Sequence, residues 1–353
     1  MRPLNYEVVR KLPPPKEIAA MFPLDQSDEK FVEESTEELK RILRNEDKRL
    51  IVIVGPCSAW PDTAVFEYAR RLKELEPMVG DALKFVLRAY VQKPRTQIGW
   101  EGPLFQPDPF SEPDFEAGKI YCRRMMVELV KMRIPIADEA VDLRNASGFL
   151  GPLSWVAIGA RSSEDPMHRK FASTLPCPVG MKNPSSGSRK SGVNSVVAAQ
   201  HTYDDELDGH QIKTAGNPYA HLVLRGGDSG SNYHLPFLME ARELLLSSGV
   251  QNPAFIVDAS HDNVRVNGDK DFLRQIEVIS SVMRDVKKHP ELRMVHKGFM
   301  IESFLKDGCQ KIETLARETV DMDGLSGTDP CLGWEKTMDP ILSLAEMQRE
   351  LMK

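Results

Sequence analysis

Cysteine is scarce in this sequence, long apolar runs are absent, and positive charge is not in excess. The five cysteines are too few and too scattered for a disulfide framework, so we expect reduced thiols in a cytoplasmic protein. The densest apolar run, residues 50–54, is about a quarter of a membrane span, which argues against a membrane protein. Lys and Arg number 46 against 52 Asp and Glu, a net charge of −6, so no nucleic-acid partner is expected.

The composition, 41% hydrophobic and 28% charged, is that of a globular chain with ample material for a core. Its 353 residues fit one α/β barrel or two ordinary domains. Residues 1–48 precede the first strand-like run and contain a proline break at 13–15. An acidic amphipathic helix is predicted within 27–49. We therefore expect an N-terminal extension, residues 1–48, for oligomer or regulatory contacts, and a catalytic barrel, residues 49–353.

From residue 50 onward, short β-branched runs alternate with helix-like stretches, the pattern of parallel strands joined by helical crossovers. The predicted strands span residues 50–55, 84–91, 134–139, 155–161, 177–183, 220–227, 254–261 and 297–303. Eight such strands predict a (β/α)₈ TIM barrel. A doubly wound open sheet is the alternative, but no GxGxxG motif follows the first strand to support it.

Three predicted loops are longer than ordinary barrel loops: residues 97–114, 185–216 and 308–333. Long loops are where function concentrates, so we expect them to cover substrate at the catalytic face or to contact other subunits.

The carboxyl ends of barrel strands converge on one site, and here they are unusually polar. Six cations end or follow predicted strands: Arg88, Lys93, Arg95, Arg161, Lys182 and Arg225. Six positive side chains so close together would repel one another unless polyanions lie between them. This predicts a site for two phosphates and a carboxylate. Arginine offers a planar fork that grips either group. The alternative is that each cation is a structural salt-bridge residue.

A second set at the strand ends combines a thiol, an imidazole and two carboxylates: Cys57, His261, Glu302 and Asp329. Together they predict a site for a divalent transition metal with a position left for substrate. Sulfur, nitrogen and oxygen ligands favour Mn²⁺, Fe²⁺, Co²⁺ or Zn²⁺ over Mg²⁺ and Ca²⁺. Taken singly, each residue has an ordinary structural role as the alternative, as a core thiol, a hydrogen-bonded histidine or a partner of the nearby cations.

A few more residues are interpreted as structural. His168 is a candidate phosphate contact, but more often such a histidine only supports its surroundings. Cys177 and Cys331 are expected to pack as apolar groups, and the pair Met125 and Met126 is expected to fill the core.

Eight motifs follow one another along the chain: GPCS, KPRT followed by GW, IGAR, CPVGMKN, LRGG, DASH, IES and TDPCLGW. In this order they resemble the type I 3-deoxy-D-arabino-heptulosonate 7-phosphate (DAHP) synthases, regulated by Phe, Tyr or Trp, over nearly the whole length. The resemblance implies the metal-dependent condensation of phosphoenolpyruvate with erythrose 4-phosphate and water, giving DAHP and phosphate. That reaction opens the shikimate pathway. The resemblance also favours a homodimer or a homotetramer.

The resemblance assigns roles to the residues already singled out. The implied metal ligands are Cys57, His261, Glu302 and Asp329. The implied phosphoenolpyruvate site consists of Arg88, Glu139, Ala160, Arg161, Lys182 and Arg225, with Ala160 lending its backbone N–H and Glu139 placing a water. The implied seat of the aldose phosphate is Lys93, Pro94, Arg95 and Thr96. The candidate catalytic residues are Lys93, Lys182 and His261, of which Lys182 or His261 is expected to relay a proton to the new alkoxide.

Some motifs depart from the family pattern. SGTDPCLGW stands where the family usually has SITDACIGW, and KNPSSG stands where it usually has KNGTDG. The loop after the second strand, which contains GPLFQPDPF, also differs from the family sequence. Because these changes touch the aldose side, a different aldose phosphate in secondary metabolism is an alternative. Residues 200–214 bear little likeness to the effector pocket of regulated members, which makes feedback inhibition doubtful. The residues are also compatible with a Schiff-base aldolase that uses Lys182, and with a barrel that has lost turnover and serves as a binding partner.

Overall fold

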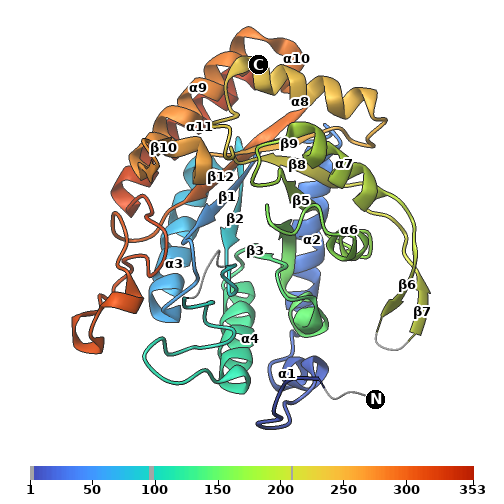
Figure 1. The fold of residues 1–353 in the computed structure, drawn as a ribbon. Coiled ribbons are helices and arrows are strands. Elements are labelled where there is room, and N and C mark those ends of the chain that lie inside the picture. The colour runs from blue at the N-terminus through green and yellow to red at the C-terminus, as the bar shows by residue number, and fades with distance from the viewer. Residues whose placement is uncertain (1–3, 95–98, 208–209) are drawn as a thin grey trace.

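The chain folds into a closed barrel of eight parallel strands surrounded by helices (Figure 1), as this computed structural model of residues 4–94, 99–207 and 210–353 describes it. The barrel strands are β1 (Leu50–Gly55), β2 (Leu83–Arg88), β3 (Ile136–Glu139), β4 (Leu153–Ile158), β5 (Val179–Lys182), β8 (Ala220–Leu224), β9 (Phe255–Asp258) and β12 (His296–Glu302). Each pairs with its neighbours in chain order, and β12 closes the barrel against β1. The predicted TIM barrel is confirmed, and the open sheet is excluded.

Several strands end earlier than the sequence predicts. The second was expected over 84–91, but β2 ends at Arg88. The next residues, Ala89 to Val91, remain buried, so the apolar pattern continues after the parallel pairing stops. The N–H of Val91 donates to the side chain of Asp138 at 3.1 Å. Hydrophobicity therefore marks burial here and not the end of the strand.

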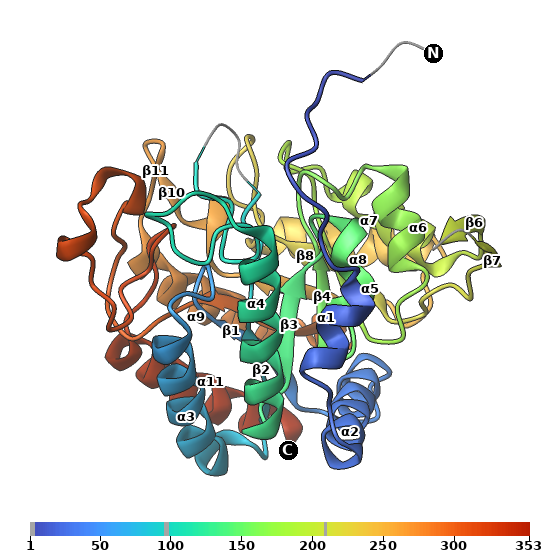
Figure 2. The same cartoon turned by 90° about the horizontal axis from the view of Figure 1, so that it is seen from below.

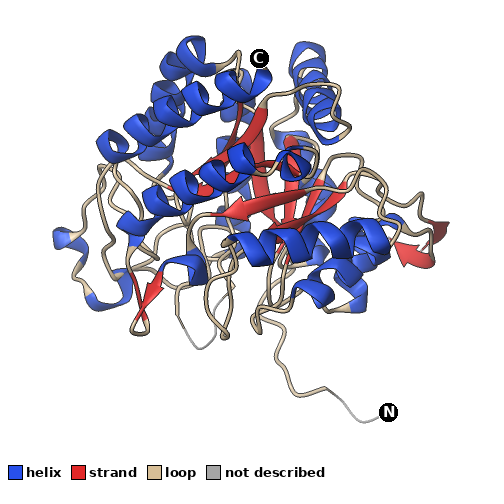
Figure 3. Ribbon diagram, turned by 90° about the horizontal axis from the view of Figure 1, so that it is seen from above, coloured by secondary structure: helices blue, strands red, loops and turns tan. Residues whose placement is uncertain are grey.

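Helices cover the outside of the barrel, and the strands occupy its centre (Figure 3). The longer helices after the barrel strands are α3 (Asp62–Val79), α4 (Phe115–Lys131), α6 (Pro166–Ala172), α7 (Arg189–Gln200), α8 (Leu235–Ser247), α9 (Gln275–Lys288) and α11 (Trp334–Met352). After β3 the chain forms only the 3₁₀ turn η1 (Leu143–Asn145) and the short helix α5 (Ala146–Phe149). The helix α10 (Pro290–Arg293) is one turn long.

The prediction of a long loop over 185–216 was wrong. The segment contains α7 and an antiparallel hairpin of β6 (Asp204–Leu207) and β7 (His210–Lys213). The α7 sequence, RKSGVNSVVAAQ, includes Gly, Ser and Asn, which are poor helix formers. Its buried residues Val193, Val196 and Ala199 pack against the barrel, and this tertiary packing outweighs the weak local propensity.

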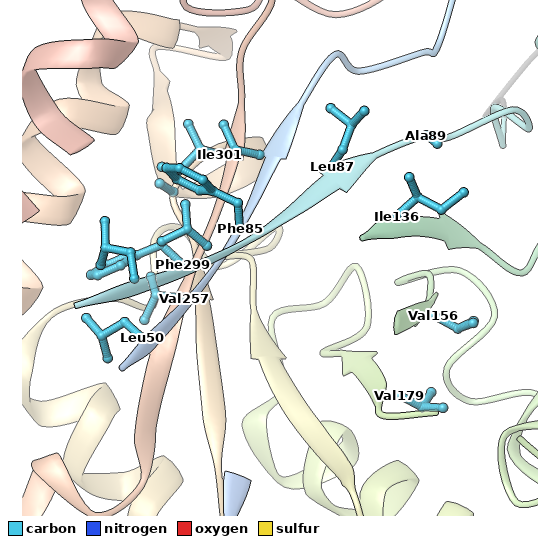
Figure 4. Packing of buried hydrophobic residues seen from close by; sticks show 14 of the residues in the cluster. Leu50, Phe85, Leu87, Ala89, Ile136, Val156, Val179, Val257, Phe299 and Ile301 are labelled. Atoms are coloured by element: carbon cyan, nitrogen blue, oxygen red, sulfur yellow. The ribbon is translucent and has the colours of Figure 1, made fainter. Parts of the chain in front are cut away.

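Two hydrophobic clusters hold the barrel together. Outward-facing side chains of the strands, among them Phe85, Leu87, Phe299 and Ile301, pack under the helices (Figure 4). Inward-facing side chains form a separate cluster. Within the barrel, Trp155 occupies space that Gly180 leaves free, because a Cβ at Gly180 would lie 2.1 Å from the indole ring. Burying each large apolar side chain contributes about 1.5–3 kcal/mol to stability.

The N-terminal helix α2 (Gln26–Leu43) is the amphipathic helix expected within 27–49. Asp25 and Asp28 form a capping box at its start. Near its end, Leu39, Ile42 and Leu43 join the cluster inside the barrel. This packing places the end of α2 against the barrel interior.

The shorter helix α1 (Pro15–Met21) packs against α5 and α4, and the segment before it extends away from the body of the molecule (Figure 2). Among the helices that the structure describes, none has both the length and the apolar character needed to cross a membrane.

Candidate functional site

A polar cavity of about 460 Å³ lies at the carboxyl ends of the barrel strands. The predicted site residues that line it are Cys57, Arg88, Lys93, Pro94, Glu139, Ala160, Arg161, Lys182, Arg225, His261, Glu302 and Asp329. Arg95 and Thr96 lie outside the described residues. The barrel thus brings together side chains that are up to 272 positions apart in the sequence, as Cys57 and Asp329 are.

Three of the four predicted metal ligands form one group. Potential donor atoms of Cys57, Glu302 and Asp329 all lie within 4.8 Å of one another, and this group can hold a metal ion. His261 stands at its edge, with Nε2 3.7 Å from Oε1 of Glu302. The structure therefore gathers a thiol and two carboxylates closely and leaves the imidazole slightly farther out.

The donor atoms already attract cations. Nζ of Lys93 lies 2.7 Å from Sγ of Cys57 and 3.0 Å from Oδ2 of Asp329. Nζ of Lys270 lies 2.7 Å from the same carboxylate oxygen. A mixed sulfur and oxygen donor set that collects two ammonium groups also suits a divalent transition metal. The residues present therefore fit the expected metal.

Burial and charge shift the pKa values of these donors. Burial, followed by repulsion from Glu302, raises the pKa of the Cys57 thiol to about 11. Burial also raises the pKa of Asp329, but attraction to Lys93 and Lys270 outweighs it and holds that pKa well below the usual range. The carboxylate is therefore ionised at pH 7, whereas the thiol keeps its proton until a metal displaces it.

His261 is neutral at pH 7, because burial lowers its pKa well below the ordinary value despite the attraction of Glu302. A neutral ring nitrogen is the form that binds a metal. Its Nδ1 lies 2.7 Å from Oδ2 of Asp258 at the end of β9. The backbone at His261 has a φ of +52°, in the left-handed region that is rare for residues other than glycine. Such strain is typical of functional positions.

Carboxylates of the protein offset part of the expected mutual repulsion, because they pair with several of the cations. Arg88 Nη2 lies 3.1 Å from Glu302 Oε1, in a pair that is almost fully buried. Lys182 Nζ lies 3.0 Å from Glu139 Oε2. These ion pairs balance part of the positive charge without a ligand, and the same cations remain suited to binding phosphate and carboxylate.

Arg225 also has a carboxylate partner, Asp262, which in turn contacts Arg265. The cavity further exposes Tyr90 and Gln92, and it includes Arg265 and Lys270 from the short hairpin of β10 (Arg265–Val266) and β11 (Asp269–Lys270). Sequence reasoning missed all four of these residues. The Asn-Gly pair at 267–268 is a strong hairpin signal that could have indicated Arg265 and Lys270.

A buried amide network fixes the backbone at Arg225. Oδ1 of Asn183 accepts hydrogen bonds from the N–H of Arg225 at 2.9 Å and from Nδ2 of Asn232 at 3.0 Å. Oδ1 of Asn232 accepts a hydrogen bond from the N–H of Gly226 at 2.8 Å, and the backbone N–H of Asn232 donates to Oδ1 of Asn263. Gly226 has a φ of +74°, and a Cβ there would lie 2.6 Å from the backbone of residue 262. The network joins the ends of β5, β8 and β9.

The residues interpreted as structural lie where expected. His168 contacts Asp165 and the carbonyl of Val141, and it does not line the cavity. The core also buries the side chains of Cys177, Cys331, Met125 and Met126.

Comparisons with known proteins agree with this arrangement. A family model described as "DAHP synthetase I family" matches residues 25–340. The Trp-sensitive phospho-2-dehydro-3-deoxyheptonate aldolase of Escherichia coli is 35% identical over 342 residues, which cover 96% of this chain and 95% of that protein. The Tyr-sensitive protein of Salmonella typhimurium is 38% identical over 329 residues, covering 92% and 89%. A solved structure of phospho-2-dehydro-3-deoxyheptonate aldolase from Francisella tularensis matches with a TM-score of 0.90 at 30% identity, covering 98% of this chain and 99% of that one.

Proposed function

This chain belongs to the DAHP synthetase I family, and we propose on that basis that it condenses phosphoenolpyruvate with erythrose 4-phosphate and water to give DAHP and phosphate. It is a transferase of aromatic biosynthesis. The observation that supports this proposal most strongly is the single cavity in which anion-binding cations and a metal-ligand group lie together.

The cations of the cavity bind phosphoenolpyruvate in this proposal. Arg88, Arg161, Lys182 and Arg225 hold its phosphate and carboxylate, and the backbone N–H of Ala160 adds a hydrogen bond. Lys93 and Pro94, followed by Arg95 and Thr96, receive the phosphate of the aldose. A cavity of about 460 Å³ lies within the range of small-molecule sites, roughly 300–1,000 Å³.

Bond formation begins at C3 of phosphoenolpyruvate, which attacks the aldehyde carbon of the acceptor. The aldehyde oxygen becomes an alkoxide and takes a proton from the ammonium group of Lys182, because His261 is neutral and serves as a metal ligand. Positive charge develops at C2, the water placed by Glu139 adds there, and one proton of that water passes through the Glu139 carboxylate to Lys182. The C2–O bond to phosphate then breaks while the new C2 hydroxyl gives its proton to the departing phosphate, which leaves the ketone of DAHP. Fixed guanidinium and ammonium groups stabilise the negative charges without having to reorganise.

We assign the metal to Cys57, Glu302 and Asp329, with His261 as the fourth ligand. Bound there, Mn²⁺, Fe²⁺, Co²⁺ or Zn²⁺ supplies a Lewis acid for the aldehyde oxygen or orients the reacting water.

The deciding experiment is a phosphate-release assay with phosphoenolpyruvate and a panel of aldose phosphates, with and without a chelator. We expect release with erythrose 4-phosphate, its loss with the chelator, and its recovery when Mn²⁺ is added. Cys57→Ala should remove both metal binding and turnover. The matched control is Cys177→Ala, because Cys177 is a buried thiol remote from the cavity. If no aldose phosphate supports metal-dependent release, the proposal is wrong.

Different outcomes would favour different functions. Preference for a pentose phosphate would change only the acceptor and would favour a role in secondary metabolism. A covalent adduct on Lys182 after borohydride treatment with substrate would replace the proposal with a Schiff-base mechanism. Complete absence of turnover in metal-loaded protein would favour a binding role.

A further inference from the structure

The barrel has a second basic cavity at its opposite end. It encloses about 250 Å³ beside the first residues of β1 and β12, between the last turns of α9 and α11. The catalytic cavity lies at the other ends of the same strands, and no residue lines both. The second cavity is therefore a separate feature of the fold.

Positive charge dominates this second cavity. Its lining includes Lys48, Arg49, Arg293 and Lys297, whereas Asp47 is the only acid among the described residues that line it. Asp47 is already paired with Arg49 at 2.7 Å. Within the described part of the chain, no ion pair joins a carboxylate to Lys48, Arg293 or Lys297, and Arg293 donates only to carbonyl groups near the end of α9. A chain of net charge −6 thus gathers uncompensated positive charge here.

Two polar side chains of the lining are buried without a matching partner. Lys297 is 4% exposed, and its ammonium group meets only the amide oxygen of Asn45. His296 is 2% exposed, and neither ring nitrogen has a hydrogen-bond partner among the described residues. A buried polar group without a partner destabilises the folded protein, because it has given up its hydrogen bonds to water. Both residues are therefore suited to an additional partner in the cavity.

Burial lowers the pKa of Lys297 to about 8, so its ammonium form predominates at pH 7. Burial, followed by repulsion from Lys297, lowers the pKa of His296 to about 3. The histidine is therefore neutral and offers one N–H donor and one acceptor nitrogen.

Besides Asn45 and Gln348, the rest of the lining is apolar and includes Leu50, Val286 and Leu351. We propose that this cavity binds a small organic anion, with a carboxylate or phosphate head at Lys297 and His296 and an apolar body against these side chains. A volume of about 250 Å³ equals that of roughly eight waters, so the ligand is the size of a monocyclic acid and not of a nucleotide.

The test uses three probes that share one ring: benzoate, phenyl phosphate and uncharged benzyl alcohol. Calorimetry on the metal-loaded enzyme saturated with phosphoenolpyruvate, which fills the catalytic cavity, should show one site for benzoate or phenyl phosphate, with benzyl alcohol binding at least about tenfold more weakly. Which of the two anions binds more tightly identifies the head group. Benzoate should leave the KM for phosphoenolpyruvate unchanged, because the two cavities share no residues.

Variants locate the binding. Lys297→Met should raise the Kd for the anion about tenfold, which corresponds to about 1.4 kcal/mol. Lys288→Met is the matched control, because Lys288 is an exposed lysine of α9 outside the cavity, and it should leave the Kd unchanged. His296→Phe keeps the ring contacts with Phe255 and Phe299, so it should fold and still bind more weakly.

Three results would overturn the proposal. They are the absence of binding of either anion, an anion Kd that is the same in Lys297→Met and His296→Phe as in the native protein, and competition of benzoate with phosphoenolpyruvate. None of these results bears on the synthase reaction, which the phosphate-release assay tests separately.

Discussion

Nζ of Lys182 on β5 lies 3.0 Å from Oε2 of Glu139 on β3, and both side chains are buried. Strand β4 separates the two strands in the barrel, so the ion pair bridges over the end of β4. A Cβ at Gly159, just after β4, would lie 2.3 Å from the Glu139 carboxylate, so glycine leaves room for that carboxylate.

Replacing Lys182 by methionine should affect stability and turnover separately. Lys182→Met leaves the Glu139 carboxylate buried without its partner, which should cost about 3–5 kcal/mol in the free energy of unfolding. The double variant Lys182→Met/Glu139→Gln should regain most of that loss in urea denaturation. Neither variant should release phosphate at more than about a hundredth of the native rate, since general acid–base groups contribute about 10²–10⁴-fold. Near-normal turnover of the single variant would refute the role of Lys182.

Asp138 should make stability fall with rising pH. Burial raises the pKa of this carboxyl to about 8, although the N–H groups of Glu139 and Val91 donate to it. The native state therefore holds a proton that the unfolded chain, with a pKa near 4, releases. Its contribution to stability is full below about pH 4 and is lost as the pH rises toward about 8, by at most about 1.4 kcal/mol per pH unit.

The measurement for Asp138 is urea unfolding at several pH values between 5 and 8. Asp138→Asn keeps an oxygen that accepts both N–H groups and cannot titrate, so this variant should lack that part of the slope. Parallel pH profiles for the native protein and the variant would contradict the prediction.

Disrupting the amide network should weaken phosphoenolpyruvate binding more than it slows chemistry. Asn232→Leu leaves the N–H of Gly226 and one acceptor site of Asn183 unpaired, at about 1–3 kcal/mol for each unsatisfied group. Because the same network holds the backbone of Arg225, we expect the KM for phosphoenolpyruvate to rise about tenfold with a smaller change in kcat. Asn194→Ala, on the exposed side of α7, is the control and should change neither value. An unchanged KM in Asn232→Leu would show that Arg225 does not depend on the network.

The apolar arm before α1 should take part in assembly. Leu4, Tyr6, Val8 and Val9 are between 71% and 91% exposed on a segment that extends from the body of the molecule (Figure 2). The predicted homodimer or homotetramer would bury such side chains. Changing all four to serine should lower the mass measured by light scattering, while circular dichroism stays native. A native protein that is monomeric, or a variant of unchanged mass, would contradict this role.

Much of the site could be predicted because polar residues follow the apolar strands directly. Cys57, Arg88, Glu139 and Lys182 each stand at or just after a strand end, and parallel strands deliver such residues to one edge. Lys270 was missed because it follows β9 by twelve residues and reaches the cavity through the β10–β11 hairpin. Its position depends on how that hairpin folds back, which residue spacing alone does not reveal.

The sequence by itself determined the number of barrel strands, the amphipathic helix α2 and the residue types at the ends of the barrel strands, because these follow from local patterns of apolar and polar side chains. Only the tertiary structure decided the partners: Lys93 and Lys270 share Asp329, and Glu139 takes Lys182. It also decided that His261 stands slightly outside the group of three metal donors. Contacts between residues far apart in the chain depend on distances that exist only once the barrel has closed.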